Sequence, residues 1–471
     1  MYTDAMQRAL REMEEKCSAR ALAEVTSLMA RVGSALKPAA TGEDAVCDEL
    51  LTSHAEFARA ALASGRLSEA ALAQQVAALL TAGQSVVLTG LSTAGLNGLV
   101  GVVADTRLRE ENRVPVHVVS QGVGKRLLVR LRNIQPSLQP ARAAAAYALS
   151  GTLQVEQPGT LVSPHVAFVE GAGGDVTVTA AAPIELGTQV IVVQEDACLR
   201  AWSADVRDEV LEDGVTMGEV LDSVSRRCAE ASSGGPREAL EQRGGLLAPL
   251  APEEVQLVLV VMRTLAADTS ARLRVRASWP SARERCGLPL LWRGALLERF
   301  RATTVGAQLE VLRRKAESVF FAAVEPELTA RGLGRLLAAR ELGSDLRATF
   351  MHALALVKSR AIAWPRPQPS GELGGEWGLI PPVADLFNGL PARDGLLASP
   401  SGQSAQTVEL LILKLGDAPP AVCFRATRDV SAGEELLACY AADSTAAFLC
   451  KYGVVPQATH GWRNPLDEVG Q

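Results

Sequence analysis

Three short segments near the C-terminus decide the expected fold of this 471-residue chain. They are residues 357–362 (VKSRAI), 382–389 (PVADLFNG) and 432–440 (AGEELLACY), and the last is followed by Tyr452-Gly453. The first ends an apolar helical run, the second carries the Asn-Gly of a turn, and the third passes from a glycine turn into a strand. Two of the four tyrosines of the chain lie here, so function is sought first in these segments.

Strand patterns lie on both sides of these segments. Residues 408–425 predict two strands joined by a Gly/Pro-rich connection, and upstream the strands 175–180 and 189–193 follow a glycine turn that contains Gly171 and Gly173. A dinucleotide-binding fold would need a helix directly after such glycines. Alternating β-branched residues predict a strand instead, which excludes that fold.

A mostly helical block, 205–355, separates the two strand-rich parts. Pro252 followed by two glutamates predicts a helix start, because proline fits the first turn and acidic side chains favour the positive end of the helix dipole. His352 lies on an apolar helical run and is expected to be a packed, hydrogen-bonded core residue. The order of elements predicts an α+β protein.

The region before residue 139 contains two different sequence patterns. Residues 1–82 show apolar residues at helical spacing, whereas 83–138 contain four short strand patterns separated by glycines and Asn-Gly. The second region resembles a small SH3-like β-barrel, and a β-meander packed on the next domain is the alternative. Lys125 is not part of a phosphate-binding P-loop, because Arg126 stands where that loop needs Ser or Thr.

Composition narrows the class of protein. The net charge of −6 is unfavourable for nucleic acid as the main partner. The eight cysteines form no C-x-x-C pair, so a zinc site of usual spacing is not expected. Neither a signal peptide nor a membrane-spanning apolar run is expected, which predicts a cytoplasmic or nuclear protein without a membrane partner.

The order of strands, helical block and C-terminal segments resembles the SET domain of the Rubisco large-subunit methyltransferase-like class, over roughly 155–455. The matching positions are Ser359-Arg360, Asp385-x-x-Asn388, Gly433-Glu434-Glu435-Leu436, Tyr440 and Tyr452-Gly453. The resemblance implies a SET-domain β-fold split by a helical insertion, preceded by the small barrel and the N-terminal helical segment. The expected parts are an N-terminal helical segment 1–82, a small barrel 83–138, a first SET part 139–204, an insertion 205–355, a second SET part 356–455 and a tail 456–471.

The resemblance also implies an activity, namely methyl transfer from S-adenosylmethionine to a side chain of a protein substrate. Lysine is the expected acceptor, and histidine stays open. By resemblance Tyr440 is the catalytic residue, Tyr452 lines the substrate channel, and no metal takes part. The implied cofactor-binding residues are Gly171, Gly173, Arg360, Asp385 and Asn388, with Asp385 bracing the turn.

Each of these residue types also has an ordinary structural use. The structural alternatives are a half-buried strand tyrosine for Tyr440, a charge at a helix C-terminus for Arg360, a turn for Asn388-Gly389, a helix cap for Tyr452-Gly453 and bracing carboxylates for Glu434-Glu435. The last of these is the expected one, because the family uses that pair structurally.

The chain departs from the family at three places. Gly389 stands where a histidine is usual, Ser444 and Thr445 stand where an asparagine is usual, and Val454 replaces a phenylalanine. Two hypotheses therefore stay open: a protein methyltransferase, and a catalytically degenerate SET-fold protein that acts as an interaction module. The oligomeric state is not indicated.

Overall fold

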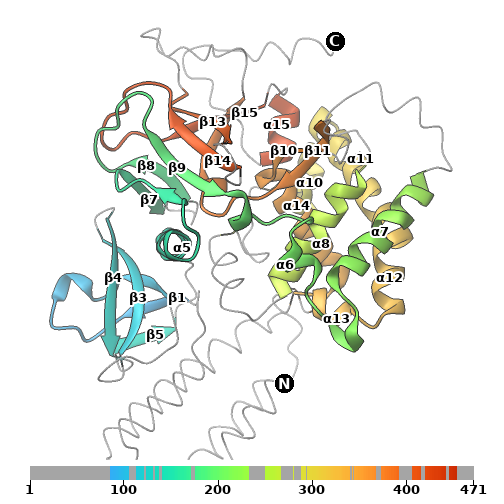
Figure 1. Cartoon of the computed structure of the whole chain (residues 1–471), viewed down its shortest axis with the longest axis horizontal. Helices are drawn as coiled ribbons and strands as arrows, with labels where there is room; N and C mark the ends of the chain where they lie inside the picture. The colour runs from blue at the N-terminus through green and yellow to red at the C-terminus, as the bar shows by residue number, and fades with distance from the viewer. Residues whose placement is uncertain are drawn as a thin grey trace, which may run out of the picture. The chain divides into compact units, whose positions relative to one another are not determined.

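The computed structural model divides into two compact units, Met1–Ala145 and Ala146–Gln471. It describes residues 85–104, 113–120, 123–130, 133–136, 141–170, 176–232, 250–266, 279, 288–292, 294–339, 342, 344–367, 373–391, 406–414, 420–441 and 445–452. The expected helical segment 1–82 and the tail 456–471 lie outside the described residues. The mixture of helices and strands is that of an α+β protein (Figure 1).

The first unit contains a five-stranded antiparallel sheet. Its strands lie in the order β4-β3-β2-β1-β5. They are β1 (Ser85–Leu88), β2 (Val100–Val103), β3 (Arg113–Ser120), β4 (Val123–Arg130) and β5 (Ile134–Pro136), with a short 3-10 helix η1 (Ala94–Leu96). The four strands expected from the sequence are confirmed. The fifth, β5, was missed because three residues ending in proline carry too little pattern.

Valines form the centre of this sheet. Val86, Val114, Val116 and Val118 are fully buried, and they alternate along β1 and β3 as a half-buried sheet requires. At Gly101 a Cβ would come within 2.5 Å of the His117 carbonyl oxygen, so the glycine is needed for the close approach of β2 and β3.

The second unit has strands from both ends of its sequence. The boundary between the units falls within helix α5 (Arg142–Glu156). The strands that follow are β6 (Leu161–Val162), β7 (Val166–Glu170), β8 (Val176–Ala180), β9 (Gln189–Gln194), β10 (Ile362–Pro367), β11 (Leu373–Leu379), β12 (Asn388–Pro391), β13 (Val408–Leu413), β14 (Ala421–Ala426) and β15 (Leu437–Ala441). β8 follows the glycine segment directly, as the sequence predicted.

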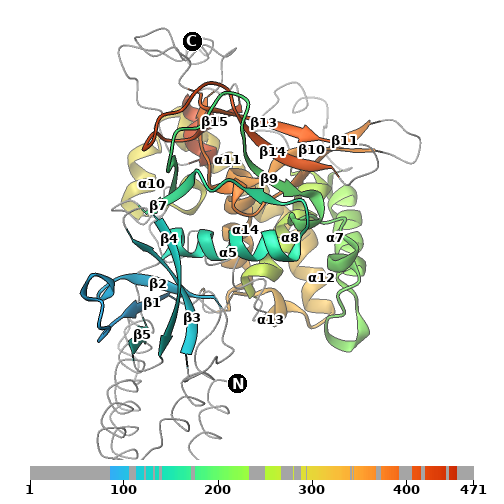
Figure 2. The same ribbon diagram turned by 60° about the vertical axis from the view of Figure 1, so that its left-hand side comes forward.

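Strands before and after the helical block pair with one another. The main sheet has the order β13-β14-β9-β6, and in it Val192 of β9 lies opposite Cys423 of β14. Outside the strands, Ile184 bridges Val430, with backbone hydrogen bonds of 2.9 and 2.8 Å. Figure 2 shows β9, β13 and β14 side by side. The strand-rich parts therefore form one body although the helical block separates them in sequence.

Helices fill the sequence between these strands. They are α6 (Ala204–Arg207), α7 (Met217–Ser232), α8 (Pro252–Ala266), α10 (Gly294–Phe300), α11 (Thr304–Val319), α12 (Glu325–Ala330), α13 (Gly334–Leu337) and α14 (Leu346–Arg360), with α15 (Thr445–Tyr452) near the end of the chain. Short turns of helix are η4 (Glu195–Ala197), η5 (Glu212–Gly214), η7 (Pro289–Leu291), the π-helix η8 (Phe320–Val324) and η10 (Ala384–Leu386). The predicted start at Pro252 is confirmed.

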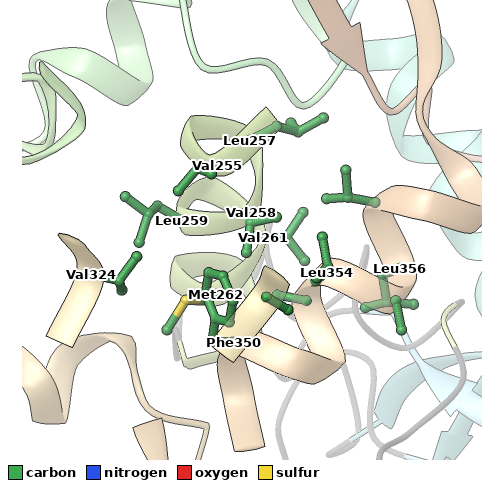
Figure 3. Close-up of a cluster of buried hydrophobic side chains, with 14 of the residues drawn as sticks. Val255, Leu257, Val258, Leu259, Val261, Met262, Val324, Phe350, Leu354 and Leu356 are labelled. Atoms are coloured by element: carbon green, nitrogen blue, oxygen red, sulfur yellow. The ribbon is translucent and has the colours of Figure 1, made fainter. Parts of the chain in front are cut away.

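Helix α8 is the centre of the helical core. Its residues from Val255 to Met262 are buried without interruption, which is the pattern of a helix enclosed on all sides. Figure 3 shows Phe350 and Leu354 of α14 and Val324 of η8 against it. Within the described residues, no helix is both long and apolar enough to cross a membrane.

Candidate functional site

Arg360 is the last residue of α14, at the first of the three segments. Asp345 caps the start of this helix by accepting a hydrogen bond from the Ala348 amide at 2.9 Å. At the other end, Arg360 turns its guanidinium toward Asp385. Its Nη1 donates to the Asp385 carbonyl oxygen and to Oδ2, both at 3.0 Å. The first and second segments therefore meet through one arginine.

Asp385 is a fully buried carboxylate. Its side chain has no exposed surface, and its Oδ2 also accepts a hydrogen bond from Trp279 Nε1 at 2.9 Å. Burial raises the pKa of Asp385, while the Arg360 charge and the hydrogen bonds from Trp279 and Arg360 oppose this rise. Asp385 Oδ1 and Arg360 Nε are buried and have no hydrogen-bond partner among the described residues.

The turn that carries Asp385 is strained. Val383 has φ 72° and ψ −46° and is completely buried. A β-branched residue at positive φ is disfavoured by roughly 1–3 kcal/mol and persists only where its surroundings hold it. The Asp385 amide donates to the Pro381 carbonyl oxygen at 2.9 Å, and the Phe387 ring stacks on Phe424 at 4.4 Å. These contacts fix the turn between the main sheet and the helical core.

The segment after η4 approaches the same turn. Leu199 and Ile380 exchange backbone hydrogen bonds of 2.9 and 3.0 Å. Arg200 pairs with Glu195 at 2.8 Å. Burial raises the pKa of the Cys198 thiol, and the negative charge of Asp385 adds to this rise. A short segment after β9 thus supplies charge close to Asp385.

Asn388 begins β12, which pairs with β15 in parallel. Asn388 lies opposite Leu437, and its exposed side chain donates to Glu435 Oε1 at 2.7 Å. The backbone of Glu435 also forms an isolated antiparallel β-bridge with Thr179 of β8, the strand that follows the glycine segment. Tyr440 belongs to β15, and its side chain lies outside the described part of the structure. The second and third segments are thus adjacent, and both lie beside β8.

The remaining predicted site residues have no described contact with Arg360, Asp385 or Asn388, or lie outside the described residues. Tyr452 ends α15, is half-buried, and packs its ring 4.7 Å from that of Phe448. Gly171 and Gly173 lie outside the described residues, and so does Gly453. The structure therefore joins Arg360, Asp385, Asn388 and the backbone of Tyr440, and describes no contact between them and the glycine segment itself.

The two adjacent glutamates brace turns. Glu434 pairs with Arg428 and accepts a hydrogen bond from the Ser431 amide at 3.0 Å. The hydrogen bond from Arg428 lowers the pKa of Glu434. Gly433, just before, has φ +82°, which glycine adopts without strain. These hydrogen bonds fit the bracing role expected for Glu434.

Two buried residues of the helical block need separate mention. His352 lies in α14 with 1% of its surface exposed, in the core as expected. Trp279 was not predicted as part of any site. Sequence offers only a weak indication for it, since a tryptophan before a proline in an Arg-rich stretch does not reveal a partner in Asp385. In the described ranges, no group of three metal-ligating side chains occurs.

Comparison with known proteins finds similarity at the level of structure alone. No protein-family model matches the chain, and no curated protein sequence does. A solved SET domain of LSMT bound to lysine and AdoHcy is 17% identical with a TM-score of 0.44, and the match covers 68% of this chain and 58% of that one. Rubisco LSMT bound to AdoMet is 14% identical with a TM-score of 0.41, covering 67% and 57%. The chain thus spans less than two thirds of these proteins, and values this low do not assign it a fold or an activity.

Proposed function

We propose that 139–204 and 356–455 form a SET-type fold split by the helical block 205–355, and that the chain is an S-adenosylmethionine-dependent protein methyltransferase. One observation carries the proposal. Arg360, Asp385 and Asn388, which the family motif singles out, lie along one connected path that ends beside the strand of Tyr440. The pairing of β9 with β14 on either side of the helical block supports the split fold.

The polar atoms of this path suit the amino-acid end of S-adenosylmethionine. The cofactor has a carboxylate and an ammonium group there, and a guanidinium is a suitable partner for the carboxylate. The Arg360 side chain keeps 16% of its surface exposed and would bind this carboxylate, whereas Asp385 has no exposed surface and would hold Arg360 in place. Asn388, Gly171 and Gly173 would bind elsewhere on the cofactor.

The chemistry asks little of the protein beyond alignment and exclusion of water. When bound, the cofactor supplies a methyl group already activated by a sulfonium. Tyr440 would orient the acceptor amine through its hydroxyl, and Tyr452 would line the channel that admits it. A lysine must arrive neutral, and an apolar channel lowers the pKa of its amine by desolvation. Lysine is the proposed acceptor on a protein substrate.

The sheet of the first unit would serve recognition. We propose that 83–138 is a small SH3-like module. A four-strand meander whose first strand also pairs with the fifth supports this, as does the buried row of valines. Such a module would bind a protein partner and leave the chemistry to the second unit.

Cofactor binding tests the enzyme hypothesis directly. Calorimetry should show that the whole chain binds S-adenosylmethionine and that Asn388→Ala weakens this binding. Tyr440→Phe should abolish methylation of a lysate with radiolabelled cofactor while it changes cofactor affinity less than about twofold. Equal loss of binding and methylation in Tyr440→Phe would show that the tyrosine is structural.

A degenerate SET-fold interaction module is the second candidate. Gly389, where the family has histidine, is the observation in its favour, because it leaves no side chain opposite Ala438 in the strand of Tyr440. Absence of binding at millimolar cofactor would contradict the enzyme hypothesis and favour this candidate.

A further inference from the structure

Trp279 links the helical block to the buried carboxylate of the motif. Its side chain packs within the apolar core of the helical block and is 3% exposed. Its indole Nε1 donates to Asp385 Oδ2 at 2.9 Å, across 106 residues of sequence. An indole N–H can only donate, so the partner it stabilises best is an ionised carboxylate.

Asp385 Oδ2 accepts hydrogen bonds from two side chains. One comes from the Trp279 indole and the other from Arg360 Nη1 at 3.0 Å. Burial disfavours the charged carboxylate and raises the pKa of Asp385, and these two donors work against that effect. Without the indole donor the carboxylate would protonate at a higher pH and hold Arg360 less firmly.

We propose that Trp279 is a positioning residue of the cofactor site: its indole N–H holds the Asp385 carboxylate, and through it the Arg360 guanidinium, in the orientation that receives the amino-acid end of the cofactor. The inference rests on the function proposed above and assigns part of the site to the helical block. Groups fixed before binding lose less entropy on binding, so affinity rises without a direct contact from Trp279.

The same bond steadies the strained turn. Asp385 follows Val383 by two residues, and the positive φ of Val383 is held by its surroundings. Asn388 starts β12 three residues after Asp385. A loosened carboxylate would therefore also loosen the turn that sets the position of Asn388.

Trp279→Phe tests the proposal, because it keeps an aromatic ring and removes the donor. The probe is S-adenosylhomocysteine, whose binding is measured by calorimetry without any turnover. Affinity should fall about tenfold at pH 7.5, as for loss of a hydrogen bond to a charged group. Trp292→Phe is the matched control, since Trp292 is buried in the same core and packs on Phe300 at 4.9 Å. It should change affinity less than about twofold.

The pH dependence separates positioning from loss of packing. The ionised form of Asp385 is present above its pKa, so wild-type affinity should fall as pH drops through that pKa. In Trp279→Phe the fall should begin at a higher pH. In the free protein, the indole N–H resonance that disappears in Trp279→Phe should shift with pH in wild type and stay constant in Asp385→Asn.

The outcomes distinguish the two proposals. A wild type that does not bind the probe overturns the proposed function, and the inference with it. A wild type that binds, with Trp279→Phe equal to it in affinity and pH profile, overturns the inference alone. A loss of the same size in Trp292→Phe would also overturn it, because general loosening of the core would then be the cause.

Discussion

Replacing Arg360 by methionine isolates the energetic role of the buried ion pair. Methionine fills much of the same volume but leaves the Asp385 carboxylate, whose side chain has no exposed surface, without its cation. Both hydrogen bonds from Nη1 are lost as well. Removal of one partner from a buried pair costs about 3–5 kcal/mol of unfolding free energy. We expect a loss in this range at pH 8.

The loss should depend on pH in a defined direction. Burial already raises the pKa of Asp385, and Arg360 is the largest influence that opposes the rise. In Arg360→Met the folded state therefore keeps a proton on Asp385 at a pH where the unfolded chain, with a carboxyl pKa of about 4, has released it. The free energy of unfolding of the variant then falls by about 1.4 kcal/mol per pH unit as pH rises over a defined range. This range begins at the carboxyl pKa of the unfolded chain and ends at the higher pKa of Asp385 in the folded variant.

Urea denaturation at pH 5 and pH 8, followed by circular dichroism, measures this effect. The double variant Arg360→Met/Asp385→Asn is the control, because it removes the buried charge as well as its partner. It should be more stable than Arg360→Met at pH 8 and should show little pH dependence from this site. A destabilisation of Arg360→Met that is the same at both pH values, or no rescue in the double variant, would refute the reasoning.

Two further substitutions test the turn that precedes β15. Gly433→Ala should lower the free energy of unfolding by about 1–2 kcal/mol, because an L-residue is strained at φ +82°. A Cβ there would meet no atom within 4 Å, so the shift of the urea midpoint reports backbone strain alone. Gly433→Asn should lose less stability, and an equal loss in both variants would contradict this explanation. Glu435→Ala should cost no more than about 1 kcal/mol, since its bond to Asn388 is exposed; a larger loss would mean that this bond holds β12 against β15.

Local pattern predicted many of the helices and strands that the structure describes. The run around Val258 has the length and continuity of a buried helix, and Pro252 with two following acids marks its start. The β-branched residues after the glycine segment predicted β8 and so excluded a dinucleotide fold. Such patterns are local, since burial on one face or on all faces repeats along the sequence itself.

Contacts between segments distant in sequence could be predicted from the sequence only in part. Asp385 was expected to brace a turn, and in the structure its carbonyl oxygen and its carboxylate both accept hydrogen bonds from Arg360, which the motif also contains. Its other side-chain partner, Trp279, lies in the helical block, and no periodicity relates the two positions. The parallel pairing of β12 with β15 is likewise set by tertiary packing, because a four-residue strand has too little pattern to choose its neighbour.

The pairing of β9 with β14 has a consequence for synthesis of the chain. Gln194 of β9 can pair with Ala421 of β14 only after more than 200 further residues have been synthesised. Helices α7 and α8, which are close in sequence, can pack together soon after they leave the ribosome. Contacts so distant in sequence form slowly, and the helical block can fold before them. The apolar strand Gln189–Gln194 is then exposed as a sheet edge until β14 has been synthesised, which makes it a target for chaperones. Chains that terminate before β14 should accumulate as aggregates or be degraded.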